Sequence, residues 1–182
     1  MPFPDHLQKA TNYLFRSVEG QPPQGTYAIL DAARDDKIYQ KLINSNIEPL
    51  CLFIGDKADE LAAVAPYLVD LKKEDPFTQW VLKTGWGKSW GIFLQSSVSL
   101  KELQRHFRQF LMVYDEEGTP LYFRFYDPRV LRIYLPTCNE SELQTVFGPV
   151  TQFYVEGKEE NQLIEFSCTE KFQLIQNVMN LF

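Results

Sequence analysis

Residues 121–136 read Leu-Tyr-Phe-Arg-Phe-Tyr-Asp-Pro-Arg-Val-Leu-Arg-Ile-Tyr-Leu-Pro, and their hydrophobic period changes at one step. From 121 to 126, apolar residues alternate with Tyr and Arg, which predicts a strand with one buried face. Asp127 can cap a helix, and Pro128 is tolerated as its first residue because the N–H there has no partner within the helix. Apolar residues then recur at helical spacing until Pro136. The sequence therefore predicts a strand that turns directly into a helix.

The remaining chain predicts an α/β fold. Nearly continuous apolar runs at 26–31 and 49–54 are typical of strands covered on both faces. A helix capped by Asp35 or Asp36 lies between them, which favours a parallel crossover unit. Further strands are predicted at 66–71, 90–95 and 111–114, with a hairpin from 151–156 and 163–167. Further helices are predicted at 6–17, after Asp75, and after the capping boxes Ser99/Glu102 and Asn139/Glu142.

The amphipathic tail at 169–182 predicts a final helix, because its apolar residues recur at helical spacing. We expect one domain spanning 1–182, with a mixed, mainly parallel sheet flanked by helices and a C-terminal hairpin and helix. The 182 residues, 45% of them hydrophobic, are enough for one substantial core and too few for two comfortable ones.

Composition also narrows the classes of function. A net charge of -6 argues against general nucleic-acid binding, which needs a basic surface. No apolar run approaches the roughly 20 residues that span a bilayer, and the first residues do not read as a signal peptide. The cysteines, Cys51, Cys138 and Cys168, are odd in number and far apart, so a disulfide framework is not expected. We expect a cytoplasmic protein without membrane insertion.

The sequence offers no catalytic or metal-binding motif in the structural context that its chemistry needs. Gly87-Lys-Ser-Trp-Gly91 matches the Gly-x-Ser-x-Gly spacing, but it follows a predicted helix and not the strand that precedes a nucleophile elbow. The sequence contains no Cys-x-x-Cys and no His-x-x-x-His, and Gly87-Lys-Ser89 lacks the earlier glycine of a phosphate-binding loop. We therefore expect no metal, no cofactor and no enzymatic activity. One alternative is a hydrolase with a site near Tyr126, Asp127 and His106. Another is a self-associating structural component.

A cluster of Arg and Tyr residues is the strongest candidate for a functional surface. These two residue types are enriched in the hot spots of protein–protein interfaces. The alternative is that some of the arginines stack on aromatic rings or pair with Asp127 and Asp115 inside the fold. The candidate protein-binding residues are Arg108, Arg124, Tyr126, Arg129, Arg132 and Tyr134.

An ordered set of short motifs resembles one known family. The motifs are Tyr27-Ala-Ile-Leu-Asp-Ala-Ala-Arg34, Cys51-Leu-Phe-Ile-Gly55, Ala65-Pro-Tyr-Leu-Val69, Trp90-Gly-Ile-Phe-Leu94, Leu103 through Arg108, Phe123-Arg-Phe-Tyr-Asp-Pro-Arg-Val-Leu131, Leu135-Pro-Thr-Cys138 and Phe147-Gly-Pro149. Over residues 26–150 the chain resembles the type VI secretion adaptor/chaperones, long catalogued as a domain of unknown function.

This resemblance implies a bacterial cytoplasmic adaptor rather than an enzyme. Such an adaptor binds a secreted effector, often through the effector's N-terminal region, and helps to load it onto the valine-glycine-repeat spike protein. Many members carry a longer C-terminal region. The tail at 169–182 is then either a reduced version of that region or a segment that packs on the domain.

Overall fold

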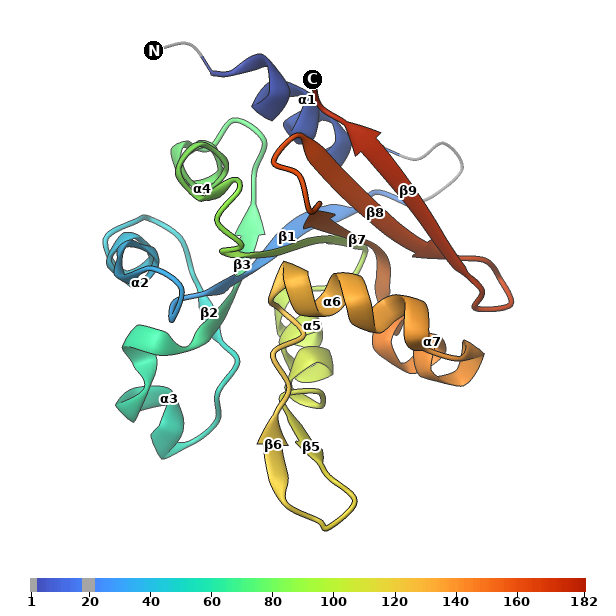
Figure 1. The fold of residues 1–182 in the computed structure, drawn as a ribbon. Coiled ribbons are helices and arrows are strands. Elements are labelled where there is room, and N and C mark those ends of the chain that lie inside the picture. The colour runs from blue at the N-terminus through green and yellow to red at the C-terminus, as the bar shows by residue number, and fades with distance from the viewer. Residues whose placement is uncertain (1–2, 18–21) are drawn as a thin grey trace.

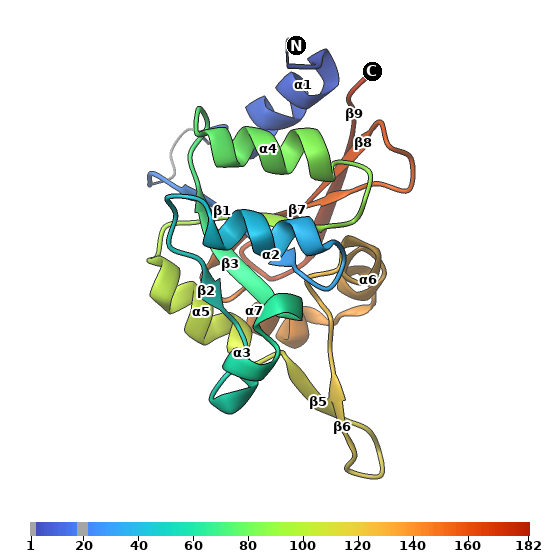
Figure 2. The same cartoon turned by 90° about the vertical axis from the view of Figure 1, so that its left-hand side faces the viewer.

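A seven-stranded sheet runs through the middle of the molecule, with helices on both of its faces (Figures 1 and 2). The computed structural model describes residues 3–17 and 22–182. The strands of the sheet are β1 (Gly25–Asp31), β2 (Leu50–Cys51), β3 (Pro66–Leu71), β4 (Gly91–Ser96), β7 (Val150–Glu156), β8 (Gln162–Cys168) and β9 (Leu174–Asn180). Their order is β2-β3-β1-β4-β7-β8-β9, and every neighbouring pair is antiparallel.

The prediction of a mainly parallel sheet was therefore wrong. β1 and β2 run in the same direction, as a strand–helix–strand unit requires, but β3 lies between them and pairs antiparallel with both. The continuous apolar runs misled the prediction because they report burial on two faces and not strand direction. Here the two faces are buried by helices, although all of the ladders are antiparallel.

The helices divide into two layers, each with its own hydrophobic core. Residues of β1 alternate between the cores, with Ile29 on one side and Ala28 and Leu30 on the other. Helices α1 (Asp5–Leu14), α2 (Asp36–Ile43) and α4 (Pro76–Gly85) cover one face. Helices α5 (Leu100–Arg108), α6 (Pro128–Tyr134) and α7 (Glu140–Phe147) cover the other. The short α3 (Asp56–Glu60), η1 (Ala62–Val64) and η2 (Leu135–Thr137) complete the helical segments among the described residues.

The local signals for helix starts were confirmed. Both predicted capping boxes, which begin α5 and α7, are present with their reciprocal side-chain and backbone bonds. Asp127 caps α6, where its carboxylate accepts the Arg129 N–H at 2.9 Å, and Pro128 is the first helical residue. These signals are reliable because they depend on a few adjacent residues only. Among the described residues, no helix is both long enough and apolar enough to cross a membrane.

The strand predicted at 121–126 is much shorter in the structure. Only Pro120–Tyr122 forms a strand, β6, which pairs with β5 (Met112–Tyr114) in a separate two-stranded sheet that projects from the body (Figures 1 and 2). We call this pair the β5–β6 ribbon. The chain then leaves the ladder and turns, and the neighbours Phe125 and Tyr126 are both buried. Their alternating sequence pattern therefore does not reflect two faces of a strand.

The predicted C-terminal helix was also wrong, because the tail forms β9 at the edge of the sheet. Phe172, which has a φ of 55°, lies in the turn that joins β8 to β9. An edge strand buries only part of each face, so its apolar residues need not alternate strictly, and the spacing in this tail also fits a helix. The tail packs on the domain, with Leu181 fully buried.

Candidate functional site

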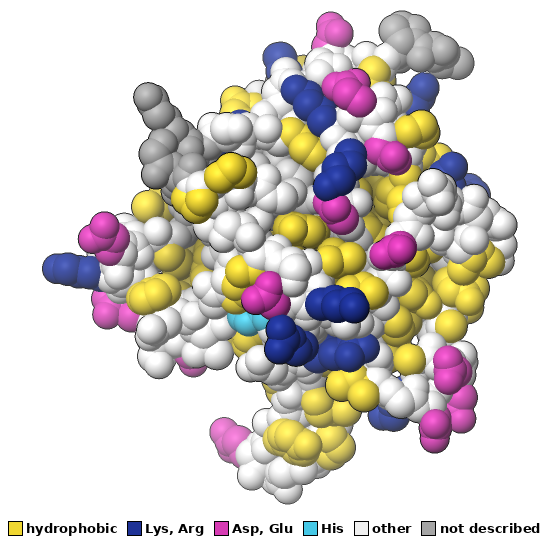
Figure 3. All heavy atoms as spheres, turned by 180° about the vertical axis from the view of Figure 1, so that it is seen from behind, with side chains coloured by type: hydrophobic (Ala, Val, Ile, Leu, Met, Phe, Trp, Pro, Cys, Tyr) yellow, Lys and Arg dark blue, Asp and Glu magenta, His cyan; other side chains and the backbone are white. Residues whose placement is uncertain are grey.

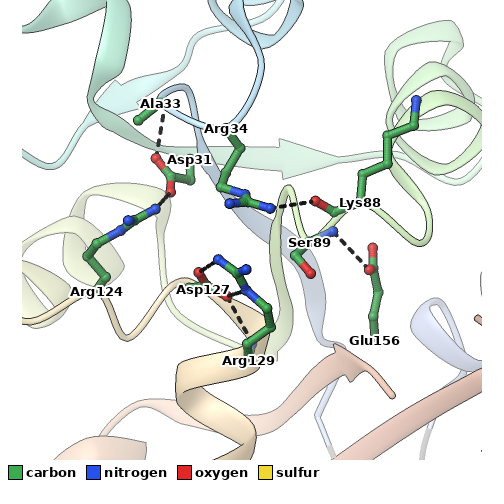
Figure 4. Close-up of polar contacts among 9 residues, drawn as sticks. All are labelled: Asp31, Ala33, Arg34, Lys88, Ser89, Arg124, Asp127, Arg129 and Glu156. Carbon is green, nitrogen blue, oxygen red and sulfur yellow. Dashed lines mark hydrogen bonds and ion pairs between the residues drawn. The ribbon is translucent and has the colours of Figure 1, made fainter. Parts of the chain in front are cut away.

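Three buried carboxyl groups lie near the N-terminal end of α6. Asp31 is the last residue of β1, Asp127 caps α6, and Glu156 is the last residue of β7. Their exposed fractions are 1%, 3% and 7%. β1 and β7 are both antiparallel to β4, so they are parallel to each other, and their C-terminal ends lie on the same side of the sheet. Figure 4 shows these three carboxyl groups with the cationic side chains around them.

Two arginines of the predicted set hold two of these carboxylates. Arg124 forms an ion pair with Asp31, and Arg129 bonds Asp127 through Nε at 2.9 Å and through Nη2 at 2.6 Å. Burial alone would raise the pKa of Asp127, but the bonds from Arg129 outweigh it and the pKa lies below its usual range. Charge-assisted bonds of this kind fix both partners in place. Arg124 therefore holds the turn before α6 against β1, whereas Arg129 and Asp127 fix each other within the first turn of α6.

The third carboxyl group, Glu156, is held by a strained loop. It accepts the Ser89 N–H at 3.1 Å, and Ser89 has a φ of 55°. Burial raises the pKa of Glu156 to about 7, although bonds from the backbone of Ser89 and Gly87 and the charge of Arg132 act in the opposite direction. Arg132 donates to the backbone carbonyl of Glu156 at 2.6 Å. The Nε of Arg132 is buried and has no hydrogen-bond partner among the described residues.

Two further predicted residues are structural. The Arg108 guanidinium donates to the carbonyls of residues 51, 52 and 53 at 3.0, 3.3 and 3.2 Å, and so holds the end of β2. Tyr126 is buried, and this burial, followed by the negative charge of Asp31, raises its pKa to about 12. Arg108 belongs to α5, and basic side chains gather over that region on the rear face of the molecule (Figure 3). The predicted set is therefore divided between two surfaces.

The outer side of α6 forms an open groove of about 620 Å³, which we call the α6 groove. Ile133 in the groove is 69% exposed, and Tyr134 packs edge-to-face on Phe123 with ring centroids 4.8 Å apart. The residues that line it are Phe123, Asp127, Arg129, Val130, Ile133, Tyr134 and Thr137. The β5–β6 ribbon adjoins this region through Phe123, which follows β6, and it exposes Val113, Tyr114, Leu121 and Tyr122.

Sequence reasoning missed Asp31, Glu156 and Ile133. The two carboxylates had a signal in the sequence, because each is the last residue of a strongly apolar strand. That signal places them together only when both strands are known to run in the same direction. A signal also existed for Ile133, because it falls outside the helical stripe formed by Val130, Leu131, Tyr134 and Leu135. Its exposure follows from how α6 rests on the sheet.

The structure is that of an α/β protein with an exposed apolar groove beside two ion pairs, Arg124–Asp31 and Arg129–Asp127, whose carboxylates are buried. Exposed apolar patches commonly mark sites of protein–protein contact. Residues 26–145 match the model of a family described as a domain of unknown function (DUF4123). This match covers more than half of the chain, so the chain belongs to that family, which is associated with type VI secretion effector adaptors. No curated protein and no solved structure matches the chain.

Proposed function

We propose that this chain is a non-enzymatic adaptor that binds a secreted effector and helps to load it onto the valine-glycine-repeat spike protein of a type VI secretion system. Membership in the family supports the secretion context. The α6 groove is the single observation that carries the binding role. It exposes apolar side chains on a helix whose preceding turn is held against β1 by the Arg124–Asp31 ion pair.

The chemistry of the groove suits an apolar segment of a partner that also carries a carboxylate. Ile133 and Val130 supply an apolar surface, and Arg129 lies at the N-terminal end of the helix. Asp127 occupies Nε and Nη2 of Arg129, but the guanidinium has further N–H donors and the side chain is 50% exposed. A partner carboxylate can therefore bond Arg129 without displacing Asp127.

The contacts of the candidate catalytic residues favour binding over hydrolysis. His106 donates from Nε2 to the Val146 carbonyl on α7 at 2.9 Å, and its ring packs against Phe110. Asp127 is occupied by Arg129, and the described residues that line its groove include neither Tyr126 nor His106. A general base needs its nucleophile within hydrogen-bond reach, and these contacts direct the groups to different partners.

The test introduces a charge into the groove at Ile133, whose side chain is 69% exposed. We expect Ile133→Asp to fold with an unchanged circular dichroism spectrum and to lose co-purification with the effector and spike proteins co-expressed from the same gene cluster. The matched control is Ile43→Asp, since Ile43 is 56% exposed on α2, which covers the other face. The control should retain both partners.

Two results would overturn the proposal in different ways. If Ile133→Asp retains its partners as well as Ile43→Asp does, the groove is not the interface. If the unmodified chain binds neither partner, the adaptor function is wrong. Charge reversal at Arg132 is a poor test, because Arg132 holds the Glu156 carbonyl and its loss would disturb the fold.

A further inference from the structure

The strand β9 presents an unprotected edge of the sheet. Within residues 3–17 and 22–182, β9 pairs with β8 alone, over seven residues with no shift of register. Its sequence, Leu-Ile-Gln-Asn-Val-Met-Asn, contains no charge and no proline. Natural edge strands are usually short, bulged, or protected by Lys or Pro, because an open edge invites another strand. β2, at the opposite edge, is only two residues long, whereas β9 has none of these protections.

The hydrogen bonds at the two ends of the β8–β9 ladder show which groups of β9 face outward. The Thr169 N–H donates to the Gln173 carbonyl at 3.0 Å, and the Leu181 N–H donates to the Asn161 carbonyl at 2.7 Å. Bonded positions alternate along an antiparallel strand, so the odd-numbered residues of β9 bond to β8. The N–H and C=O groups of Leu174, Gln176, Val178 and Asn180 therefore point to the open edge.

We propose that two copies of the chain associate through their β9 strands, antiparallel about a two-fold axis at Asn177, and so form one continuous sheet. In this register Gln176 lies opposite Val178 of the second copy, and Leu174 lies opposite Asn180 of the second copy. All four outward residues then exchange backbone hydrogen bonds. A shift of the axis to residue 176 or 178 leaves outward residues of β9 without a partner in the strand.

The side chains favour a second copy as the occupant. Ile175 is 40% exposed and Val178 is 51% exposed, on opposite faces of the sheet, so the partner strand should be partly apolar on both faces. β9 itself has this property. In the proposed register Ile175 lies opposite Met179 of the second copy. Because β9 is uncharged, the two strands meet without like-charge repulsion, although each chain carries a net charge of -6.

The first test is the mass in solution of the full chain, measured by light scattering over a range of concentrations. We expect a dimer for the unmodified chain and a monomer for Val178→Lys, which places a charge at the open edge. The matched control is Val113→Lys, on the β5–β6 ribbon, where the side chain is 39% exposed and the mass should remain dimeric. A monomer for the unmodified chain, or a dimer that survives Val178→Lys, would overturn the proposal.

The second test reads the register directly. Only residue 177 lies opposite itself, as a non-hydrogen-bonded pair with Cα atoms about 4.5 Å apart, which is within the range of a disulfide. With diamide as the oxidant, two Asn177→Cys thiols lose two electrons and two protons and form one interchain disulfide, while diamide is reduced to its hydrazine. We expect Asn177→Cys to give a covalent dimer and Val178→Cys to remain uncrosslinked. The unmodified chain, treated in the same way, measures the crosslinking that comes from the three native cysteines.

Equal crosslinking of the two cysteine variants would exclude this register. The dimer is also independent of the adaptor function, because the α6 groove lies on a different element. Ile133→Asp should therefore leave the mass in solution unchanged, so that failure of one proposal does not imply failure of the other.

Discussion

The buried Glu156 predicts a fold that loses stability as the pH rises from about 4.5 to about 7. Its carboxyl group has a pKa of about 7 in the folded chain against a usual value of 4.5, chiefly because it is buried. Between these two pH values the folded chain keeps a proton that the unfolded chain has released. The free energy of unfolding therefore falls across this window as pH rises. The perturbation that tests this is Glu156→Gln, which keeps the side chain neutral at every pH.

The size of the effect follows from the difference between the two pKa values. A difference of 2.5 units, from 4.5 to 7, corresponds to about 3 kcal/mol at roughly 1.4 kcal/mol per unit. We expect the unmodified chain and Glu156→Gln to have similar stability below pH 4.5, where Glu156 is protonated in both the folded and the unfolded chain. Above pH 7 the variant should be more stable, by up to about 3 kcal/mol.

The assay is urea unfolding followed by circular dichroism at about pH 5 and about pH 8. His106 contributes a slope of the opposite sign, because burial lowers its pKa and the unfolded chain takes up that proton first. This contribution is common to both proteins and cancels in the comparison. Glu140→Gln, at an exposed position on α7, is the matched control and should show the slope of the unmodified chain. The reasoning is refuted if Glu156→Gln keeps that slope or is the less stable protein at pH 8.

Three further changes test the packing and the ion pairs. Phe107→Ala should cost about 3 to 5 kcal/mol in urea unfolding, because it empties a fully buried position in the core beneath α5. Arg124→Met should cost about 2 to 3 kcal/mol, less than for a fully buried pair because the side chain is 44% exposed. Adding Asp31→Asn should recover part of that cost, since no unpaired charge then remains; a double variant less stable than Arg124→Met would contradict this. Gly91→Ala should prevent folding, because its Cβ would lie 2.0 Å from a carbonyl oxygen of β1. Gly118→Ala, in the open turn of the ribbon, should cost only about 1 kcal/mol, and calorimetry would show an unfolding transition for this variant alone.

Most individual helices and strands could be predicted from the sequence, because caps, prolines and short apolar runs act locally. Asp75 and Asp127 each cap a helix whose first residue is proline, and both were predicted. The arrangement of the sheet could not be predicted in the same way. Whether β3 lies beside β1 or beyond it depends on contacts between residues far apart in the chain, and a continuous apolar run is the same in either case.

The candidate site was predicted only in part, for a related reason. The sequence identified Arg124, Arg129 and Tyr134, which the structure places near the turn into α6 and along the groove. It also grouped them with Arg108, whose guanidinium serves the end of β2 instead. Residue type indicates that an arginine can bind a partner, but only the fold determines whether that partner is internal.

The ion pairs and the groove together change which residues around the turn into α6 should carry recognition. The charged residues, which are the most distinctive in sequence, use their donors on Asp31 and Asp127 within the fold. The Arg124–Asp31 pair fixes the turn before α6 at the end of β1, and the helix then presents Ile133 to solvent. The arginines are thus chiefly positioning residues. Binding energy should come from the apolar side chains that they position, with Arg129 adding selectivity for a partner carboxylate.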